Sequence, residues 1–243
     1  MRLTTRAAAI LALATFGAAI HGTAVRASGR SLLSQAVKNT DNALSYREAD
    51  TVRLTVGGAS MSSSAWEIYD QRHNRERDHD HFTIVRPGGQ TLRYVVDVAM
   101  LDHRTYYRTT LDHAGWRMRS GYGYTDPVTG DRWIRSPLIF SYLNHTPVAS
   151  EEHAANSTLH IRFHLPSSLS GKATGRIDVW ISTHGAPFIA RYSERLSERV
   201  QGKKSYETSS TRLSDFNQPV TIAAPRIGRD RHRPGLPRMR CPR

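Results

Sequence analysis

Apolar and polar residues alternate with a period of two along most of the chain. Tyr94, Val96, Val98 and Met100 share one face of such a segment, and Asp97 lies on the other. The alternation predicts half-buried antiparallel strands, each with one apolar face. It recurs in the segments 52–56, 66–68, 82–84, 159–165, 177–181 and 188–192.

Two other segments have the spacing of helices. Apolar residues at 32, 33, 36, 37, 43 and 44 predict an amphipathic helix from Ser31 to about Ala43, with Ser31 or Ser34 as its cap. Apolar density after Pro137 predicts a short helix within 136–144. The predicted fold class is α+β: a large curved antiparallel β-sheet, or half-barrel, with two or three helices covering its concave face. A sheet of this size that its own side chains do not fill encloses a ligand cavity.

The two ends of the chain differ in composition from the middle. Residues 1–24 have two arginines, an apolar stretch from Ala7 to Ile20 and small residues after it, which predicts an export signal peptide. Residues 226–243 are rich in arginine and proline and predict a disordered basic tail. The domain between them is expected to span 31–225.

Charge and cysteine content restrict the function classes. The formal net charge is +13, and much of it lies in the tail, so the body is only mildly basic. The tail either contacts an anionic membrane surface or another polyanion by charge, or is merely a solvated end. The single cysteine, Cys241, excludes an intramolecular disulfide, and no cysteine follows the signal segment to carry a lipid anchor. We therefore expect an exported protein, either periplasmic or extracellular in the cell envelope, that is not lipid-anchored.

No catalytic signature accompanies the strands. The chain has no Gly-x-Ser-x-Gly, His-Glu-x-x-His or phosphate-binding loop, so we expect no enzyme activity and no cofactor. The segment Arg75–His81 is the strongest polar cluster. If it is a strand, His79 and His81 share one face and could begin a zinc or copper site. The alternative is a solvated hairpin loop, and because no third ligand is readable we predict no metal.

Three segments resemble a known family. Residues 94–109 are similar to paired strands of exported bacterial lipid carriers, in which an apolar strand and a short turn precede Tyr-Tyr-Arg. Residues 176–187 resemble their strand-turn-strand with a tryptophan before a Gly-x-Pro turn, and 215–225 their closing strand. The family is the LolA-like superfamily, which includes the mycobacterial LppX/LprG lipoproteins. The resemblance implies a half-barrel that holds acyl chains in an apolar cavity, without catalysis. The missing anchor cysteine is a departure from many relatives.

The function predicted from these observations is an exported carrier of lipid or acylated lipoprotein. The alternatives are an envelope-stress sensor or protein-interaction module of the same fold, and a polyanion-binding protein that depends on the tail; no nucleic acid is expected as a partner. Strand phase selects the residues that would line the cavity. They are Leu54, Val56, Trp66, Ile68, Phe82, Ile84, Tyr94, Val96, Val98, Leu138, Phe140 and Leu143.

Overall fold

The computed structural model describes most of the chain between residues 24 and 227. The described residues are 24–111, 115–126, 128–129, 132–133, 140–146, 148–154, 158–165, 174–200 and 202–227. The predicted signal peptide up to residue 23, the tail from residue 228 and the predicted lining residue Leu138 lie outside them.

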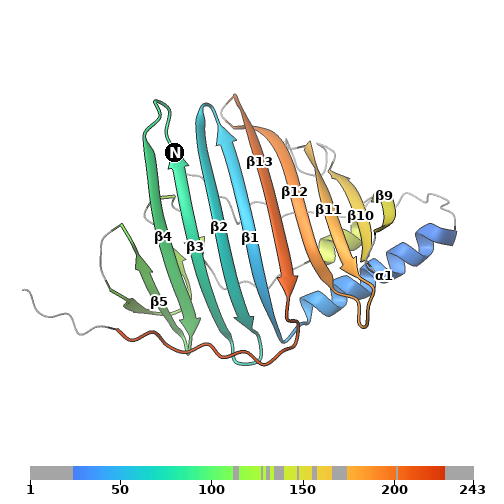
Figure 1. Cartoon of the computed structure of the whole chain (residues 1–243), viewed down its shortest axis with the longest axis horizontal. Coiled ribbons are helices and arrows are strands. Elements are labelled where there is room, and N and C mark those ends of the chain that lie inside the picture. Colours follow the sequence, from blue (N-terminus) through green and yellow to red (C-terminus); the bar gives the residue numbers. More distant parts are fainter. Residues whose placement is uncertain are drawn as a thin grey trace, which may run out of the picture.

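An antiparallel sheet of eleven strands forms the body of the protein (Figure 1). Its order is β6-β5-β4-β3-β2-β1-β13-β12-β11-β10-β9, and its two edge strands are not paired with each other. With one long helix beside it, this confirms the predicted fold class of a large curved antiparallel sheet with few helices. The strands are β1 (Ser45–Val56), β2 (Ala59–Asp70), β3 (Arg75–Val85), β4 (Thr91–Leu101), β5 (Arg104–Thr109), β6 (Arg117–Ser120), β9 (Val148–Ala154), β10 (Thr158–Leu165), β11 (Thr174–Ser182), β12 (Ile189–Val200) and β13 (Lys203–Ser214).

The chain enters the sheet at its centre and returns there. Successive hairpins carry it from β1 to the edge at β6. The segment that then leads to the opposite edge contains the small sheet of β7 (Tyr124–Thr125) and β8 (Arg132–Trp133). From β9, hairpins lead back to β13, which pairs with β1 in ten consecutive positions from Arg47 with Ser214 to Val56 with Ser205. The sheet is therefore continuous although its halves are distant in sequence.

Residues with left-handed backbone form two of the turns between strands. Gly88 and Gly89, with φ of 95° and 86°, form the turn between β3 and β4. Asp102 and His103 join β4 to β5 with φ of 52° and 58°, the left-handed conformation that a two-residue hairpin turn needs. The segment Arg75–His81 lies within β3, so the alternative of a solvated loop there is wrong.

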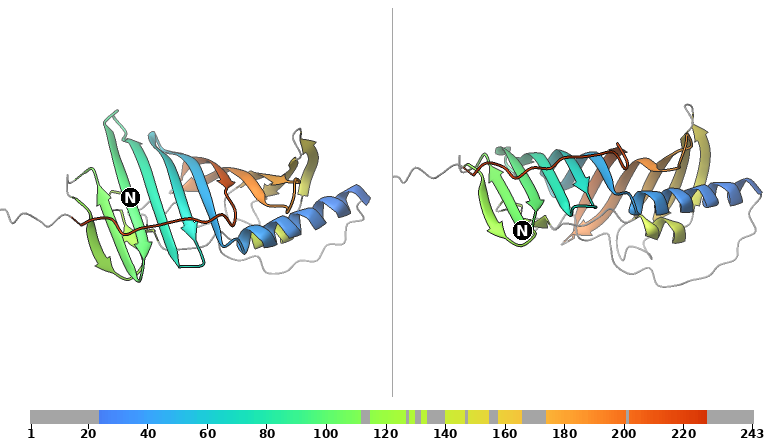
Figure 2. Two further views of the ribbon diagram at one scale, coloured as in Figure 1. Left: turned by 60° about the horizontal axis from the view of Figure 1, so that its bottom comes forward. Right: turned by 90° about the horizontal axis from the view of Figure 1, so that it is seen from below.

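The main helix begins earlier than its apolar spacing predicts. α1 spans Ala24–Asp41, so Ser31 and Ser34 lie inside it and do not cap it. The second predicted helix is a short 3-10 helix, η1 (Ser141–His145). α1 lies along the end of the sheet formed by β9–β12 (Figure 2). Among the described residues no helix is both long and apolar enough to cross a membrane.

Two apolar clusters lie on the same face of the sheet, which we call the inner face. The helix cluster joins side chains of α1 and η1 to the strands at one end. Its buried residues are Leu33, Ala36, Val37, Ala43, Tyr46, Tyr69, Phe140, Leu143, Leu159, Ile161, Phe163, Ile177, Val179, Ile181, Ile189 and Leu213. The β4 cluster lies toward the other end and consists of Leu54, Val56, Met61, Phe82, Tyr94, Val96, Val98, Met100 and Tyr124. The opposite surface is called the outer face.

The segment after β13 follows the ends of the strands. Asp215 and Asn217 have φ of 54° and 58°, which turns the chain away from the sheet. The backbone amide of Asn217 donates to the Ser45 carbonyl at 2.9 Å, and the Arg75 side chain donates to the Ile222 carbonyl at 3.4 Å. Residues 215–227 therefore pack along the strand ends without forming the closing strand that the family resemblance implies (Figure 1).

Candidate functional site

The β4 cluster brings together most of the predicted lining residues. Leu54, Val56, Phe82, Tyr94, Val96 and Val98 are all buried within it, and Ile84 packs against it partly buried. The rings of Phe82 and Tyr94, paired across β3 and β4, stack with centroids 4.9 Å apart. Met61, Met100 and Tyr124 belong to the same cluster. The alternation in β4 places Met100 on the same face as Tyr94, whereas Tyr124 lies in a two-residue strand that no sequence pattern indicates.

The other predicted residues lie elsewhere. Phe140 and Leu143 pack in the helix cluster, against α1. Trp66 and Ile68 belong to the outer face, because Glu67 and Tyr69 alternate with them on the inner face. The expectation that Trp66 shares a face with Leu54 therefore does not hold.

The wrong prediction for the inner face of β2 has a physical cause. The inner positions of this strand between Met61 and Tyr69 are Ser63, Ala65 and Glu67, which are small or polar. The larger apolar residues Trp66 and Ile68 lie on the outer face, so the apolar alternation indicated the wrong side. Trp66 remains 40% exposed.

A short segment after β6 covers the β4 cluster. Tyr124 of β7 contacts Tyr107 of β5 with ring centroids 5.0 Å apart. The fully buried Asp126 accepts a hydrogen bond from the Tyr94 hydroxyl at 3.2 Å. The same oxygen, Oδ1, accepts the backbone amides of Val128 at 2.7 Å and Thr129 at 2.8 Å. Asp126 thus ties the covering segment, whose described residues are 122–126 and 128–129, to the inner face.

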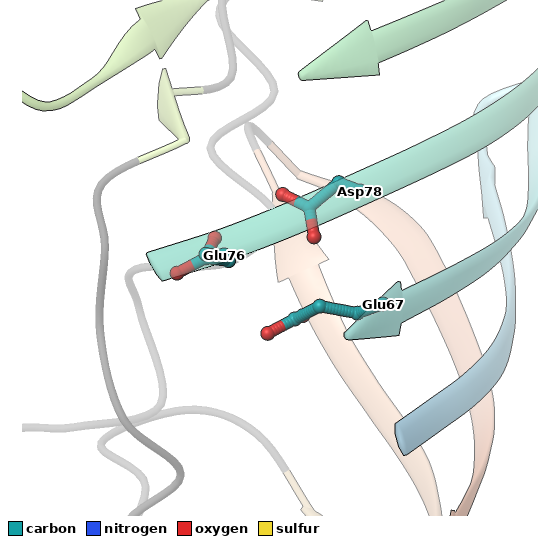
Figure 3. Close-up of side chains that lie close together, drawn as sticks. All are labelled: Glu67, Glu76 and Asp78. Carbon is teal, nitrogen blue, oxygen red and sulfur yellow. The ribbon is translucent and has the colours of Figure 1, made fainter. Parts of the chain in front are cut away.

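Acidic residues occupy the inner face between the two clusters. Glu67 on β2 and the neighbouring Glu76 and Asp78 on β3 project on the same side of the sheet (Figure 3). One carboxylate oxygen from each lies within 4.8 Å of the others. Among the described residues this is the group that could hold a metal ion, and carboxylate oxygens suit hard cations. Three carboxylates alone do not define a metal centre, so we assign none here.

A second acidic group lies on β12 and β13. Burial, together with the charges of Glu194 and Glu198, raises the pKa of Glu207 to about 7. Burial also raises the pKa of Glu194, although its hydrogen bond with Tyr142 opposes the shift. These side chains therefore take up protons more readily than ordinary glutamates do.

The histidines of β3 lie on the outer face. The Nδ1 atom of His79 is 2.7 Å from Oδ1 of Asp97, and its Nε2 atom is 2.9 Å from Nε2 of His81. The Trp66 ring stacks on His79 at 5.4 Å, and Arg108 donates to Oδ2 of Asp97 at 2.6 Å. The expected sharing of one face by the two histidines is confirmed. No metal was predicted at this pair, and that prediction remains open.

A corresponding polar network lies at the other end of the outer face. Asp178 on β11 lies 2.9 Å from Nε2 of His160, 2.8 Å from Nε of Arg162 and 2.8 Å from Nε of Arg176. Burial works to raise the pKa of Asp178, but the hydrogen bonds from Arg162 and His160 and the charge of Arg176 lower it. The carboxylate is therefore held ionised by its neighbours.

The described residues form two surface cavities, one near the centre of the sheet and one at the strand ends beside the residues that follow β13. One has a volume of about 470 Å³ and includes Trp66, Ile68 and Ala49 in its lining. The other, of about 540 Å³, lies beside the turn between β11 and β12 and the residues after β13. Neither is lined by the β4 cluster, whose interior is occupied by its own side chains and by the covering segment.

Comparison with solved structures finds similar folds at low identity. LprF from Mycobacterium bovis is 15% identical with a TM-score of 0.48, over 82% of this chain and 97% of that one. The Mycobacterium tuberculosis lipoprotein LppX is 14% identical with a TM-score of 0.41, over 81% and 99%. A DUF1329 family protein from Desulfovibrio piger is 11% identical with a TM-score of 0.28, over 81% and 94%.

No protein-family model and no curated protein sequence matches the chain significantly. LppX belongs to the group of lipoproteins that the sequence resemblance named. At these identities and TM-scores the similarities support no inference about the function of this chain.

Proposed function

We propose that the protein is an exported, non-enzymatic carrier that binds the acyl chains of a lipid or of an acylated lipoprotein against the β4 cluster. The observation that supports this most directly is the covering of that cluster. Its apolar face on β1–β4 is closed by the two-residue strand β7 and a loop instead of a helix. Such a cover is shorter than a helix, so a ligand has to displace only a few residues to reach the cluster.

The dimensions of the face suit an acyl chain. The inner row of β4 runs from Tyr94 through Val96 and Val98 to Met100, about 20 Å at the rise of a strand. Each methylene that leaves water contributes about 0.8 kcal/mol, so a long chain can bind without many polar contacts. An apolar row without a sharp polar motif is therefore what such a ligand requires.

The covering segment would have to move for a ligand to enter. Tyr124 is buried within the cluster, so an acyl chain along β4 would take the place of its ring. The bonds of Asp126 to Tyr94, Val128 and Thr129 hold the cover in place when no ligand is bound. Binding then exchanges the side-chain contacts of the cover for contacts with the ligand.

Native mass spectrometry of the mature protein from an envelope-containing host tests the proposal first. Near-stoichiometric acyl lipid that is released by solvent extraction is the expected result. A clean unliganded mass that persists after incubation with lipid vesicles would contradict it and would favour the alternative of an interaction or sensing module. Capture of a specific envelope protein would then be the next step.

Photolabelling locates the ligand without altering the fold. A fatty acid with a diazirine on its chain should label peptides that contain Leu54–Met61 and Phe82–Met100. The matched control is the segment Leu159–Leu165, which is equally apolar and lies on the same face under α1. Labelling of that segment in place of the first two would contradict the assignment of the ligand to the β4 cluster.

A further inference from the structure

The centre of the outer face is open to solvent. Ala49, in the middle of β1, is exposed although Trp66 and Arg212 pair with it from the neighbouring strands. Trp66 is 40% and Tyr206 51% exposed. No described segment covers this region, in contrast to the inner face.

Basic side chains are spread over this face. The strand registers assign them to the same side as Trp66. They are Arg47 and Arg53 on β1, Arg75 and Arg77 on β3, Arg93 on β4, Arg104 and Arg108 on β5, Arg162 on β10, Arg176 on β11, Arg191, Arg195 and Arg199 on β12, and Lys204 and Arg212 on β13. The basic character of the folded body is thus concentrated on one face.

The acidic residues of the same face are already bonded. Among the described residues of β1–β4 and β10–β13, they are Asp70, Asp97 and Asp178. Asp70 lies 2.7 Å from Nδ1 of His73, and the other two bond to the histidines and arginines described above. Their charges are therefore matched locally, and Arg53, Arg195 and Arg212 remain exposed without a carboxylate on the same face beside them.

Aromatic rings flank a pair of cations at the centre of the face. One row across the paired strands runs His79, Trp66, Ala49, Arg212, Arg191, Trp180 and His160. The guanidinium of Arg191 lies 4.6 Å from the centroid of the Trp180 ring. From β4 to β10 such a row extends roughly 35 Å. Tryptophan and arginine together suit a boundary between polar headgroups and apolar chains.

We propose that the outer face is a docking surface for a lipid bilayer that contains anionic phospholipids. The cations are distributed over two dimensions, as a planar array of phosphates requires, whereas a nucleic-acid strand would call for a stripe or groove. The exposed rings of Trp66 and Tyr206 add contacts at headgroup level. This surface lies opposite the β4 cluster, so docking does not depend on the proposed cargo.

Vesicle flotation of the full mature chain tests the surface. The vesicles contain phosphatidylcholine with about one third phosphatidylglycerol, and pure phosphatidylcholine is the reference. The triple variant Arg53→Gln, Arg195→Gln and Arg212→Gln should bind about a hundredfold more weakly, because each arginine near an anionic surface contributes about fivefold. Raising the ionic strength from about 0.05 M to about 0.5 M should weaken wild-type binding in the same direction.

A second triple variant with the same change in net charge is the control, because it separates the effect of net charge from that of position on the face. Arg72→Gln, Arg86→Gln and Arg119→Gln neutralise three exposed arginines in the hairpin turns and the edge strand β6, away from the centre of the face. The control should retain most of the binding. An equal loss in both triple variants would overturn the proposal, because net charge alone would then explain binding.

Two further measurements separate the sheet from the tail. Truncation after residue 227 should leave most of the binding, and its loss on truncation would assign the membrane contact to the tail. A spin-labelled headgroup lipid should quench the fluorescence of Trp66, and Trp66→Phe should remove that part of the quenching. Binding to an acidic polysaccharide without binding to anionic vesicles would also overturn the proposal.

Discussion

The two ends of the inner face have the same strand pattern but different covers. Under α1, the helix cluster buries Leu33 and Val37 of the helix against Ile161 and Val179 at 0–2% exposure. The β4 cluster is equally apolar, yet its cover is the two-residue strand β7 and a loop held by Asp126. The comparison shows that an apolar strand face becomes structural core or a candidate binding surface according to what covers it.

Removal of a large core ring gives the largest effect expected. Phe163→Ala in the helix cluster and Phe82→Ala in the β4 cluster should each lower the free energy of unfolding by about 3–5 kcal/mol. An acyl ligand at about 100 times its Kd should raise the free energy of unfolding of wild type and of Phe163→Ala by about 2.7 kcal/mol. The ligand should not stabilise Phe82→Ala in this way. Urea unfolding with and without lysophosphatidylglycerol measures it, and equal ligand stabilisation of both variants would remove the distinction between the clusters.

Loss of the anchor of the covering segment comes next. Asp126→Ala removes the acceptor of three hydrogen bonds and leaves the backbone amides of Val128 and Thr129 without it. We expect a loss of about 2–3 kcal/mol and faster hydrogen exchange at Val128 and Thr129. Tyr94→Phe, which removes only one of the bonds, is the matched control and should cost about 1 kcal/mol. Unchanged exchange in Asp126→Ala would show that other contacts hold the cover.

The raised pKa of Glu207 predicts a pH dependence of stability. The folded protein keeps this proton up to about pH 7, whereas the unfolded chain releases it near pH 4.5. Between these values the folded state binds more protons, so the free energy of unfolding falls as pH rises and levels off above about 7. Because the side chain is partly exposed, Glu207→Gln should be about 1–2 kcal/mol more stable than wild type at about pH 8.

Denaturant titrations across the pH range measure this difference. At about pH 4 the variant and wild type should have nearly the same stability, because Glu207 is protonated in both of its states. Glu198→Gln serves as a comparison, since it removes one of the charges that raise the pKa and should reduce the slope only in part. A variant with the same pH slope as wild type would show that other groups carry the dependence.

The smallest effect is expected at Trp66 on the outer face of β2. Trp66→Ala should change the free energy of unfolding by less than about 1 kcal/mol, because the ring is 40% exposed on the outer face. Met61→Ala on the inner face of the same strand is the control and should cost about 2–5 kcal/mol. Thermal or urea unfolding compares them. A larger loss for Trp66→Ala would contradict the face assignment.

The amino-acid sequence determined the antiparallel class and indicated β1–β5 and β10–β12, whereas β6–β9 and β13 match none of the predicted segments. Local alternation suffices for this much, because the pleat period is a property of a few neighbouring residues. It also placed Leu54, Phe82, Tyr94 and Val96 on one face. The size of the sheet and the resemblance to lipid carriers both predicted a cavity, whereas in the structure neither surface cavity is lined by the β4 cluster.

Tertiary structure decided the rest. Alternation defines two faces of a strand but not which of them is buried, and in β2 the pairing with β1 and β3 directed Glu67 inward and Trp66 outward. Likewise only the fold shows that α1 covers one cluster and Asp126 holds a loop over the other. The physical reason is that burial depends on what packs against a face, and the packing partners are distant in sequence.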